Sequence, residues 1–250
     1  MKKLIYFTIS NNIEYLNILK ICIKSLNKFD YDGDILLITN FEKAIRDNIE
    51  FKNDIHFLNI EGLDILTSSS NKLKIYKFEK RDKYDKFIYC DLDTIWIKPP
   101  NILFDSIQEN KIYMSTEYHQ RLLMSHKYWG GILLSKEETD YINNNNIIGL
   151  NAGFFAFNRN MLETIRKIDD FFLDNLDKAS TCLEQPYINT FLFRNNLYRS
   201  TIDTYITNNA NFMSELEFDL FKVNGGVLLH FSAGIGNVDF KYKNMIKYID

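Results

Sequence analysis

Hydrophobic and polar positions follow two patterns through the first hundred residues. Short apolar runs, typical of buried strands, alternate with segments whose apolar residues recur at helical spacing. The predicted strands are residues 4–9, 34–39, 55–60 and 86–90, and the predicted helices are one carrying Leu16, Leu19, Ile23 and Leu26, then residues 41–48 and 71–80. This alternation predicts an α/β fold, a Rossmann-like three-layer α/β/α arrangement around a mostly parallel central sheet. Ligands of such sheets bind beyond the carboxyl ends of the strands.

The second half of the chain is less regular. Residues 117–150 show no sustained period and are interpreted as loops with short elements. Beyond them the sequence predicts a strand at 152–157, a helix carrying Leu162, Ile165, Phe172 and Leu176, a helix at 186–195 and a last buried strand at 227–231. Because no repeat or linker interrupts the chain, we expect one domain over residues 1–250.

Composition narrows the possible partners. The chain has 250 residues, 46% hydrophobic, which is enough to bury a large core. Its net charge of -3 excludes a general attraction to nucleic acid. Three cysteines without metal or disulfide spacing favour a reducing compartment. The first apolar run stops at Thr8, too early for a signal peptide, and no run approaches the roughly 18 apolar residues of a membrane span. We therefore expect a cytoplasmic protein.

Two carboxylates, Asp91 and Asp93, follow the predicted strand at 86–90 with only Leu92 between them. Adjacent anions repel each other unless a cation separates them, and a divalent metal does so while keeping positions open for phosphate oxygens. The alternative is that both acids simply end the strand as turn or cap residues. The tripeptide alone leaves both interpretations open.

A histidine ends the last apolar strand. His230 is followed by a glycine-containing loop that would let backbone approach a ligand. An imidazole together with two carboxylates suits Mn²⁺ better than Mg²⁺, which prefers oxygen ligands alone. A histidine satisfied within the core is the alternative.

Four motifs follow one another along the chain: Asp91-Leu92-Asp93, Asn151-Ala152-Gly153-Phe154-Phe155, residues 184–189, and His230-Phe231 with its glycine loop. In this order they resemble glycosyltransferase family 8, the glycogenin-like retaining enzymes. The resemblance implies a GT-A fold and transfer of a sugar, with retention, from a nucleotide-sugar donor to a hydroxyl acceptor on a glycan, lipid or protein. The donor would be a UDP-sugar. Mn²⁺, with Mg²⁺ as the alternative, would be held by Asp91, Asp93 and His230.

The same resemblance assigns the donor-binding residues. They are Thr8, Ile9, Asn11, Asn12, Tyr15, Lys72, Asp91, Leu92, Asp93, Gly153 and Gly234. Side-chain amides can read the edge of a base, and a tyrosine ring can stack on it. For the two asparagines the alternative is helix capping. For Lys72 it is a solvated lysine face, since several other lysines crowd the same stretch.

The resemblance also implies a catalytic group formed by Glu184, Gln185 and Asn151. A capping box ending at Glu184 would place Pro186 inside a helix, where its missing N–H is needed, so a helix beginning at Pro186 is favoured. Glu184 is then expected to be free just before the helix. Its role, as nucleophile, acceptor-positioning group or stabiliser of an oxocarbenium-like state, stays open, whereas Gln185 and Asn151 would position the sugar.

One departure from the family pattern keeps other functions in view. The lysine that clamps the diphosphate in the family is missing, because Gly236 and Asn237 stand where it would fall. Lys241 and Lys243 of the following segment are the candidates to substitute for it. The missing lysine favours a non-catalytic nucleotide-sugar binding protein as the alternative. A phosphohydrolase of the haloacid-dehalogenase type ranks lower, because its motif needs a residue between the second Asp and the Thr, and Thr94 follows Asp93 directly.

Overall fold

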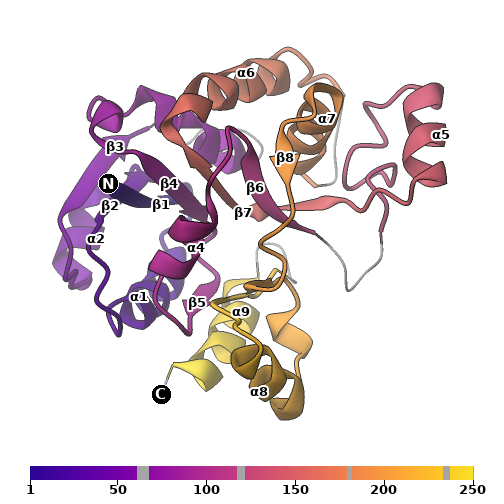
Figure 1. The fold of residues 1–250 in the computed structure, drawn as a ribbon. Helices are drawn as coiled ribbons and strands as arrows, with labels where there is room; N and C mark the ends of the chain where they lie inside the picture. The colour runs from indigo at the N-terminus through magenta and orange to yellow at the C-terminus, as the bar shows by residue number, and fades with distance from the viewer. Residues whose placement is uncertain (61–67, 117–121, 179–181, 233–236, 250) are drawn as a thin grey trace.

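The computed structural model describes residues 1–60, 68–116, 122–178, 182–232 and 237–249. Among these residues the strands form two sheets. The larger has seven strands in the order β3-β2-β1-β4-β7-β6-β8, and the smaller has three in the order β5-β10-β9 (Figure 1). Strands β1 to β4 pair in parallel, while β7 is antiparallel to both its neighbours. The predicted α/β fold with a mostly parallel central sheet is confirmed.

The strands are β1 (Lys3–Ile9), β2 (Asp34–Thr39), β3 (Ile55–Asn59), β4 (Lys86–Cys90), β5 (Thr94–Trp96), β6 (Ile112–Thr116), β7 (Leu150–Asn158), β8 (Tyr198–Arg199), β9 (Ile206–Thr207) and β10 (Leu228–His230). The α-helices are α1 (Tyr15–Leu26), α2 (Glu42–Asn48), α4 (Asn101–Ser106), α5 (Lys136–Asn144), α6 (Leu162–Leu173), α7 (Gln185–Asn195), α8 (Glu215–Val223) and α9 (Val238–Met245). Short 3₁₀ helices include η1 (Ser70–Lys77).

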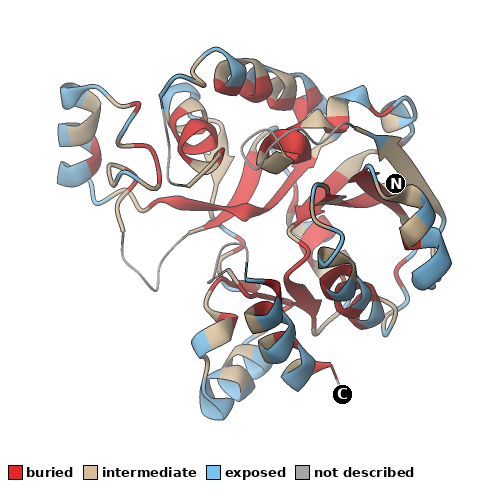
Figure 2. Ribbon diagram, turned by 180° about the vertical axis from the view of Figure 1, so that it is seen from behind, coloured by how far each residue is buried: buried red, intermediate tan, exposed pale blue. Residues whose placement is uncertain are grey.

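Alternating side chains of the large sheet build two apolar layers. In β1, Ile5 and Phe7 pack in the cluster that holds α1 and α4, whereas Leu4 and Tyr6 pack in the cluster that holds η1, α6 and α7. Both faces of the central strands are therefore covered, which is why most of their residues are apolar. Figure 2 shows the buried residues concentrated in these strands and on the inward sides of the helices.

The small sheet brings the end of the chain to the end of β4. Strand β10 pairs antiparallel with β5, with His230 opposite Thr94, and in parallel with β9. Because β5 begins one residue after Asp93, this pairing carries His230 to the carboxyl end of β4. None of the helices in the described ranges is long and apolar enough to span a bilayer.

The sequence predictions differ from the structure in three segments. Residues 70–77 form a 3₁₀ helix rather than an α-helix, because buried side chains run consecutively from Ser70 to Leu73 and leave no 3.6-residue stripe. Residues 136–144, expected in a region of loops with short elements, form the regular helix α5, which begins at a capping box between Ser135 and Glu138. Helix α6 ends at Leu173, before the predicted Leu176.

Candidate active site

The Asp91-Leu92-Asp93 tripeptide lies where the two sheets meet. The backbone N–H of Asp91 donates to the carbonyl oxygen of Gly153 in β7 at 2.7 Å, and the N–H of Phe231 donates to the carbonyl oxygen of Asp93 at 2.8 Å. The tripeptide is thus held on one side by the large sheet and on the other by the small one.

Three predicted metal ligands converge there. Asp91, Asp93 and His230 each offer one ligand atom, and these atoms lie within 4.8 Å of one another. The Nε2 atom of His230 is 3.5 Å from Oδ1 of Asp93 and 3.8 Å from Oδ2 of Asp91. Two ligand atoms each about 2.1 Å from one ion lie about 3 to 4.2 Å apart, depending on the angle between them. Both distances from His230 Nε2 fall in this range, and the carboxylate and imidazole groups of the three side chains are donors of the kind that hold a divalent cation.

The remaining oxygen of each acid is held by a neighbouring side chain. Oδ1 of Asp91 accepts hydrogen bonds from Lys72 Nζ, at 3.2 Å, and from the Tyr89 hydroxyl. Oδ2 of Asp93 pairs with the ammonium group of Lys241 from α9. Each carboxylate thus has one oxygen fixed from outside and the other facing His230, an arrangement that orients ligands before an ion binds.

Burial and charge differ between the two acids. The side chain of Asp93 is 4% exposed and that of Asp91 is 33% exposed, so a ligand would reach the centre from the Asp91 side. Burial alone would raise the pKa of Asp93, but the charges of Lys241 and His230 outweigh burial and hold this pKa well below its usual range. Asp93 is therefore a carboxylate at neutral pH.

Lys72 joins this centre to Glu184. Its Nζ atom is 2.7 Å from Glu184 Oε1 and 3.1 Å from the carbonyl oxygen of Ala152, and both side chains of the ion pair are 6% exposed. Although burial lowers the pKa of Lys72, the carboxylates of Asp91 and Glu184 outweigh it and raise this pKa above its ordinary value. The solvated-lysine alternative is wrong. Glu184 precedes α7 as expected, but it is paired and not free.

Gln185 and Asn151 brace the backbone beside the acids. The Gln185 side chain accepts from the Ala152 N–H at 2.9 Å and donates to the Tyr128 carbonyl oxygen at 3.1 Å. Oδ1 of the buried Asn151 accepts from the Gly153 N–H at 2.7 Å. Both amides therefore fix the strand that borders the centre.

Gly153 makes room for the histidine ring. A Cβ atom at this position would lie 2.2 Å from Cε1 and 2.7 Å from Nε2 of His230, far inside ordinary contact distance. Because Gly153 has no side chain, the His230 ring can pack directly against the backbone of β7 and face both acids.

The predicted base-binding segment begins at the carboxyl end of β1 and continues to the start of α1. Thr8 shares a hydrogen bond of 3.2 Å with the Tyr89 hydroxyl, and so reaches Asp91 through that ring. Oδ1 of Asn12 accepts from the Glu14 N–H at 2.9 Å, a local turn contact before α1, whose N-cap residue Glu14 makes no side-chain cap hydrogen bond. Asn11 is exposed with a φ of 67°.

The other predicted donor-binding residues differ in accessibility. Ile9 and Leu92 are buried in the apolar cluster around α1, and Tyr15 is half-buried at the start of that helix. Gly234 lies outside the described residues. Of the two candidate replacement lysines, Lys241 reaches the centre and Lys243 is exposed.

Sequence reasoning missed Tyr89 and Asn208 at this site. Tyr89 could have been found, because residues two apart in a strand share a face and Tyr89 precedes Asp91 by two. Asn208, whose Oδ1 is 3.0 Å from His230 Nδ1, follows a two-residue strand that has no sequence signature.

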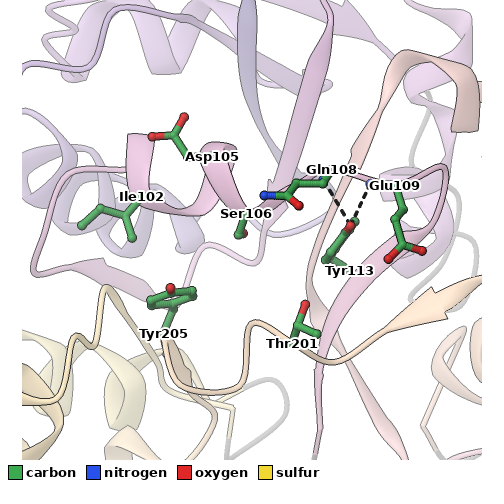
Figure 3. A pocket seen from close by; sticks show the side chains of 8 residues that line it. All are labelled: Ile102, Asp105, Ser106, Gln108, Glu109, Tyr113, Thr201 and Tyr205. Atoms are coloured by element: carbon green, nitrogen blue, oxygen red, sulfur yellow. Dashed lines mark hydrogen bonds between the residues drawn. The ribbon is translucent and has the colours of Figure 1, made fainter.

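A pocket of about 560 Å³ lies elsewhere, between α4, the start of β6 and the segment before β9 (Figure 3). Its lining residues are Ile102, Asp105, Ser106, Gln108, Glu109, Tyr113, Thr201 and Tyr205. None of these lining residues is a predicted site residue. The candidate active site is therefore identified from the side chains of Asp91, Asp93 and His230 and not from this pocket.

Similar solved structures are glycosyltransferases. The galactosyltransferase LgtC, solved with donor and acceptor sugar analogues, has a TM-score of 0.64 and 16% identity, covering 98% of this chain and 95% of its own. The chain has a GT-A fold. WbbM, a bifunctional glycosyltransferase, gives a TM-score of 0.62 and 14% identity, covering 98% of this chain and 49% of its own. GlyE of Streptococcus pneumoniae TIGR4 gives a TM-score of 0.59 and 17% identity, covering 98% of this chain and 60% of its own.

The chain thus spans less than two thirds of WbbM and GlyE, but nearly all of LgtC. No protein-family model and no curated protein sequence matches it. At these identities the likeness shows the GT-A fold, and the activity has to be argued from the residues at the centre.

Proposed function

We propose that this protein is a retaining, metal-dependent glycosyltransferase of the family 8 type, which moves a sugar from a UDP-sugar to a hydroxyl acceptor. The observation that carries the proposal is the convergence of Asp91, Asp93 and His230 at the carboxyl end of β4. The GT-A fold of the chain supports it, and so does the presence of donor and acceptor sugar analogues in the LgtC structure.

Asp91, Asp93 and His230 would hold the cation. A bound Mn²⁺ would neutralise the charge that builds up on the departing diphosphate, the kind of electrostatic stabilisation that dominates many catalysed transfers. The half-exposed Asp91 faces the side from which the donor would arrive, and Asp93 is anchored behind it. The two acids thus have different tasks, one open to the ligand and one fixed in the core.

Lys72 and Glu184 would act on the sugar end of the donor. Their ion pair is buried beside Asp91, so it supplies a cation and an anion in fixed positions and with little exchange with water. In this arrangement Lys72 faces the phosphate linkage. The Glu184 carboxylate, held by that ammonium group, stabilises positive charge that develops on the anomeric carbon.

The base would lie against the segment after β1. Exposed Asn11 and half-buried Tyr15 would supply an amide for the base edge and a ring to stack on it, and Thr8 would link this subsite to Asp91 through Tyr89. Gln185 and Asn151 would keep β7 in place while the acceptor hydroxyl attacks from the face that the leaving group vacates.

Binding and donor turnover test the proposal. Thermal stability should rise with Mn²⁺ and UDP together, and rise further with the matching UDP-sugar, since ligands that bind only the folded state stabilise it. Slow hydrolysis of that donor should need Mn²⁺ and be lost in Asp93→Asn. Stabilisation by adenine nucleotides alone would refute the base assignment, and turnover unchanged by chelation would refute the metal.

A non-catalytic nucleotide-sugar binding protein is the second candidate. It is favoured by Asn237, which stands where the family has its diphosphate lysine and here caps α9 by accepting from the Phe240 N–H at 3.0 Å. Lys241, the replacement that reaches the centre, is engaged with Asp93. Binding of a UDP-sugar with no hydrolysis and no transfer to any acceptor would support this candidate.

A further inference from the structure

The orientation of the Asn208 side chain is settled by the strand next to it. Asn208 is buried, and its Nδ2 atom lies 3.2 Å from the carbonyl oxygen of Thr116 and 3.0 Å from the Ser115 hydroxyl, both in β6. A carbonyl oxygen only accepts hydrogen bonds, so the amide nitrogen of Asn208 must face Thr116. The amide oxygen then faces His230, and the Ser115 hydroxyl lies 3.3 Å from it as a second possible donor.

This orientation determines the tautomer of His230. Oδ1 of Asn208 is 3.0 Å from Nδ1 of His230, and because an amide oxygen only accepts, Nδ1 must carry the proton. In the neutral ring, Nε2 then presents its lone pair toward Asp91 and Asp93. That is the tautomer that can bind a cation.

Without Asn208 the two acids would favour the opposite tautomer. Both carboxylates lie within 4 Å of Nε2, and a carboxylate attracts an N–H but repels a lone pair. A proton on Nε2 would hydrogen-bond to Asp93 and block the nitrogen as a ligand. In the metal-free centre, Nε2 of His230 would therefore become protonated and unable to bind a cation unless the ring proton is held on Nδ1.

We infer that Asn208 is a positioning residue, which keeps His230 in the tautomer able to bind a divalent cation. The use of that tautomer rests on the proposed function, whereas the tautomer itself does not. Through Thr116 and Ser115 the amide is anchored to the large sheet, while His230 belongs to the small one. The residue thus couples the position of the third ligand to the large sheet, whose strand β4 leads into Asp91.

The direct test is the ¹⁵N spectrum of histidine-labelled, metal-free protein at a pH of about 8.5, where an ordinary imidazole is neutral. Wild type should show His230 protonated at Nδ1. In Asn208→Leu, which keeps the size but lacks the acceptor, the proton should move to Nε2. Manganese affinity, measured by electron paramagnetic resonance of free Mn²⁺, should fall about 10- to 100-fold, the usual effect of removing such an orienting partner.

Two further variants separate positioning from folding. Asn208→Asp keeps an acceptor for Nδ1 and should retain both the tautomer and Mn²⁺ affinity to within a few-fold, even though its bond to Thr116 is lost. Ser115→Ala removes one partner of Asn208 but leaves the amide orientation fixed by Thr116, so it should behave as wild type. If Asn208→Leu fails to fold, the wild-type spectrum and Asn208→Asp still decide the matter.

The inference is overturned if wild-type His230 is protonated at Nε2, or if Asn208→Leu keeps both the tautomer and the manganese affinity. An Nδ1-protonated wild type that moves its proton in Asn208→Leu, but binds no Mn²⁺, would uphold the role of Asn208 and contradict the proposed metal-dependent function.

Discussion

Replacement of Gly153 by alanine should remove His230 from the candidate centre without touching a charged group. The added Cβ would lie 2.2 Å from the imidazole Cε1, whereas carbon atoms in contact are about 3.5 Å apart, so the two must separate by about 1.3 Å. The backbone of Gly153 is held by the Asp91 N–H at 2.7 Å. The ring is therefore the part that moves.

The expected size of the effect follows from this displacement. A ligand nitrogen shifted by about 1 Å lies well outside the roughly 0.2 Å tolerance of a metal bond, so Mn²⁺ affinity should fall at least about 10- to 100-fold. Overpacking of this kind costs about 1 to 3 kcal/mol of the free energy of unfolding.

The assay combines Mn²⁺ titration with chemical denaturation of the metal-free protein, in wild type, Gly153→Ala, His230→Ala and the double variant. If the methyl group acts through the imidazole, Gly153→Ala should cost much less stability once His230 is alanine, which a double-mutant cycle measures directly. A single variant that keeps wild-type manganese affinity and stability would refute the reasoning, as would a cycle without coupling.

Three other changes have defined outcomes. Lys72→Met and Lys74→Met each break an ion pair of η1 and should each lower the free energy of unfolding, measured by denaturation, by about 3 to 5 kcal/mol. Only Lys72→Met should also abolish donor hydrolysis. Equal losses of turnover in the two variants would contradict a donor-side role for Lys72. Lys241→Met leaves the Asp93 carboxylate buried without its ammonium partner, so Mn²⁺ should raise its melting temperature more than that of wild type, and equal shifts would be the contrary result. Burial raises the pKa of the Cys22 thiol to about 12. A thiol reagent at pH 8 should therefore label only the half-buried Cys182 in native protein, and all three cysteines after unfolding. Rapid labelling of a second cysteine in native protein would contradict the burial of the other two.

Elements with a local signature could be predicted from the sequence. Strands β2 and β4 have the predicted bounds, because each is a continuous apolar run that is covered on both faces. Helix α5 could have been added, since the capping box from Ser135 to Glu138 is a sequence signal. In the small sheet, β10 lies within the predicted strand at 227–231, whereas the short strands β5 and β9 could not be predicted, because pairing with distant partners is what defines them.

The same distinction applies to the centre. Asp91, Asp93 and His230 could be proposed because each follows or ends an apolar strand, where sheets of this kind place ligands. The partner of Glu184 could not be read from the sequence, because Lys72 lies on a distant segment crowded with other lysines and nothing local marks it as buried. Ion pairs between distant segments depend on tertiary packing, which the order of residues does not display.

The pairing of β10 with β5 has a consequence for how the protein is made. The two acids stand at positions 91 and 93, whereas the imidazole that faces them stands far later in the sequence, at position 230. On the ribosome, the parallel strands and both carboxylates are synthesised well before His230, so a nascent chain carries an acidic edge without its third member. The three ligands would then come together only after β10 has been made and has paired with β5.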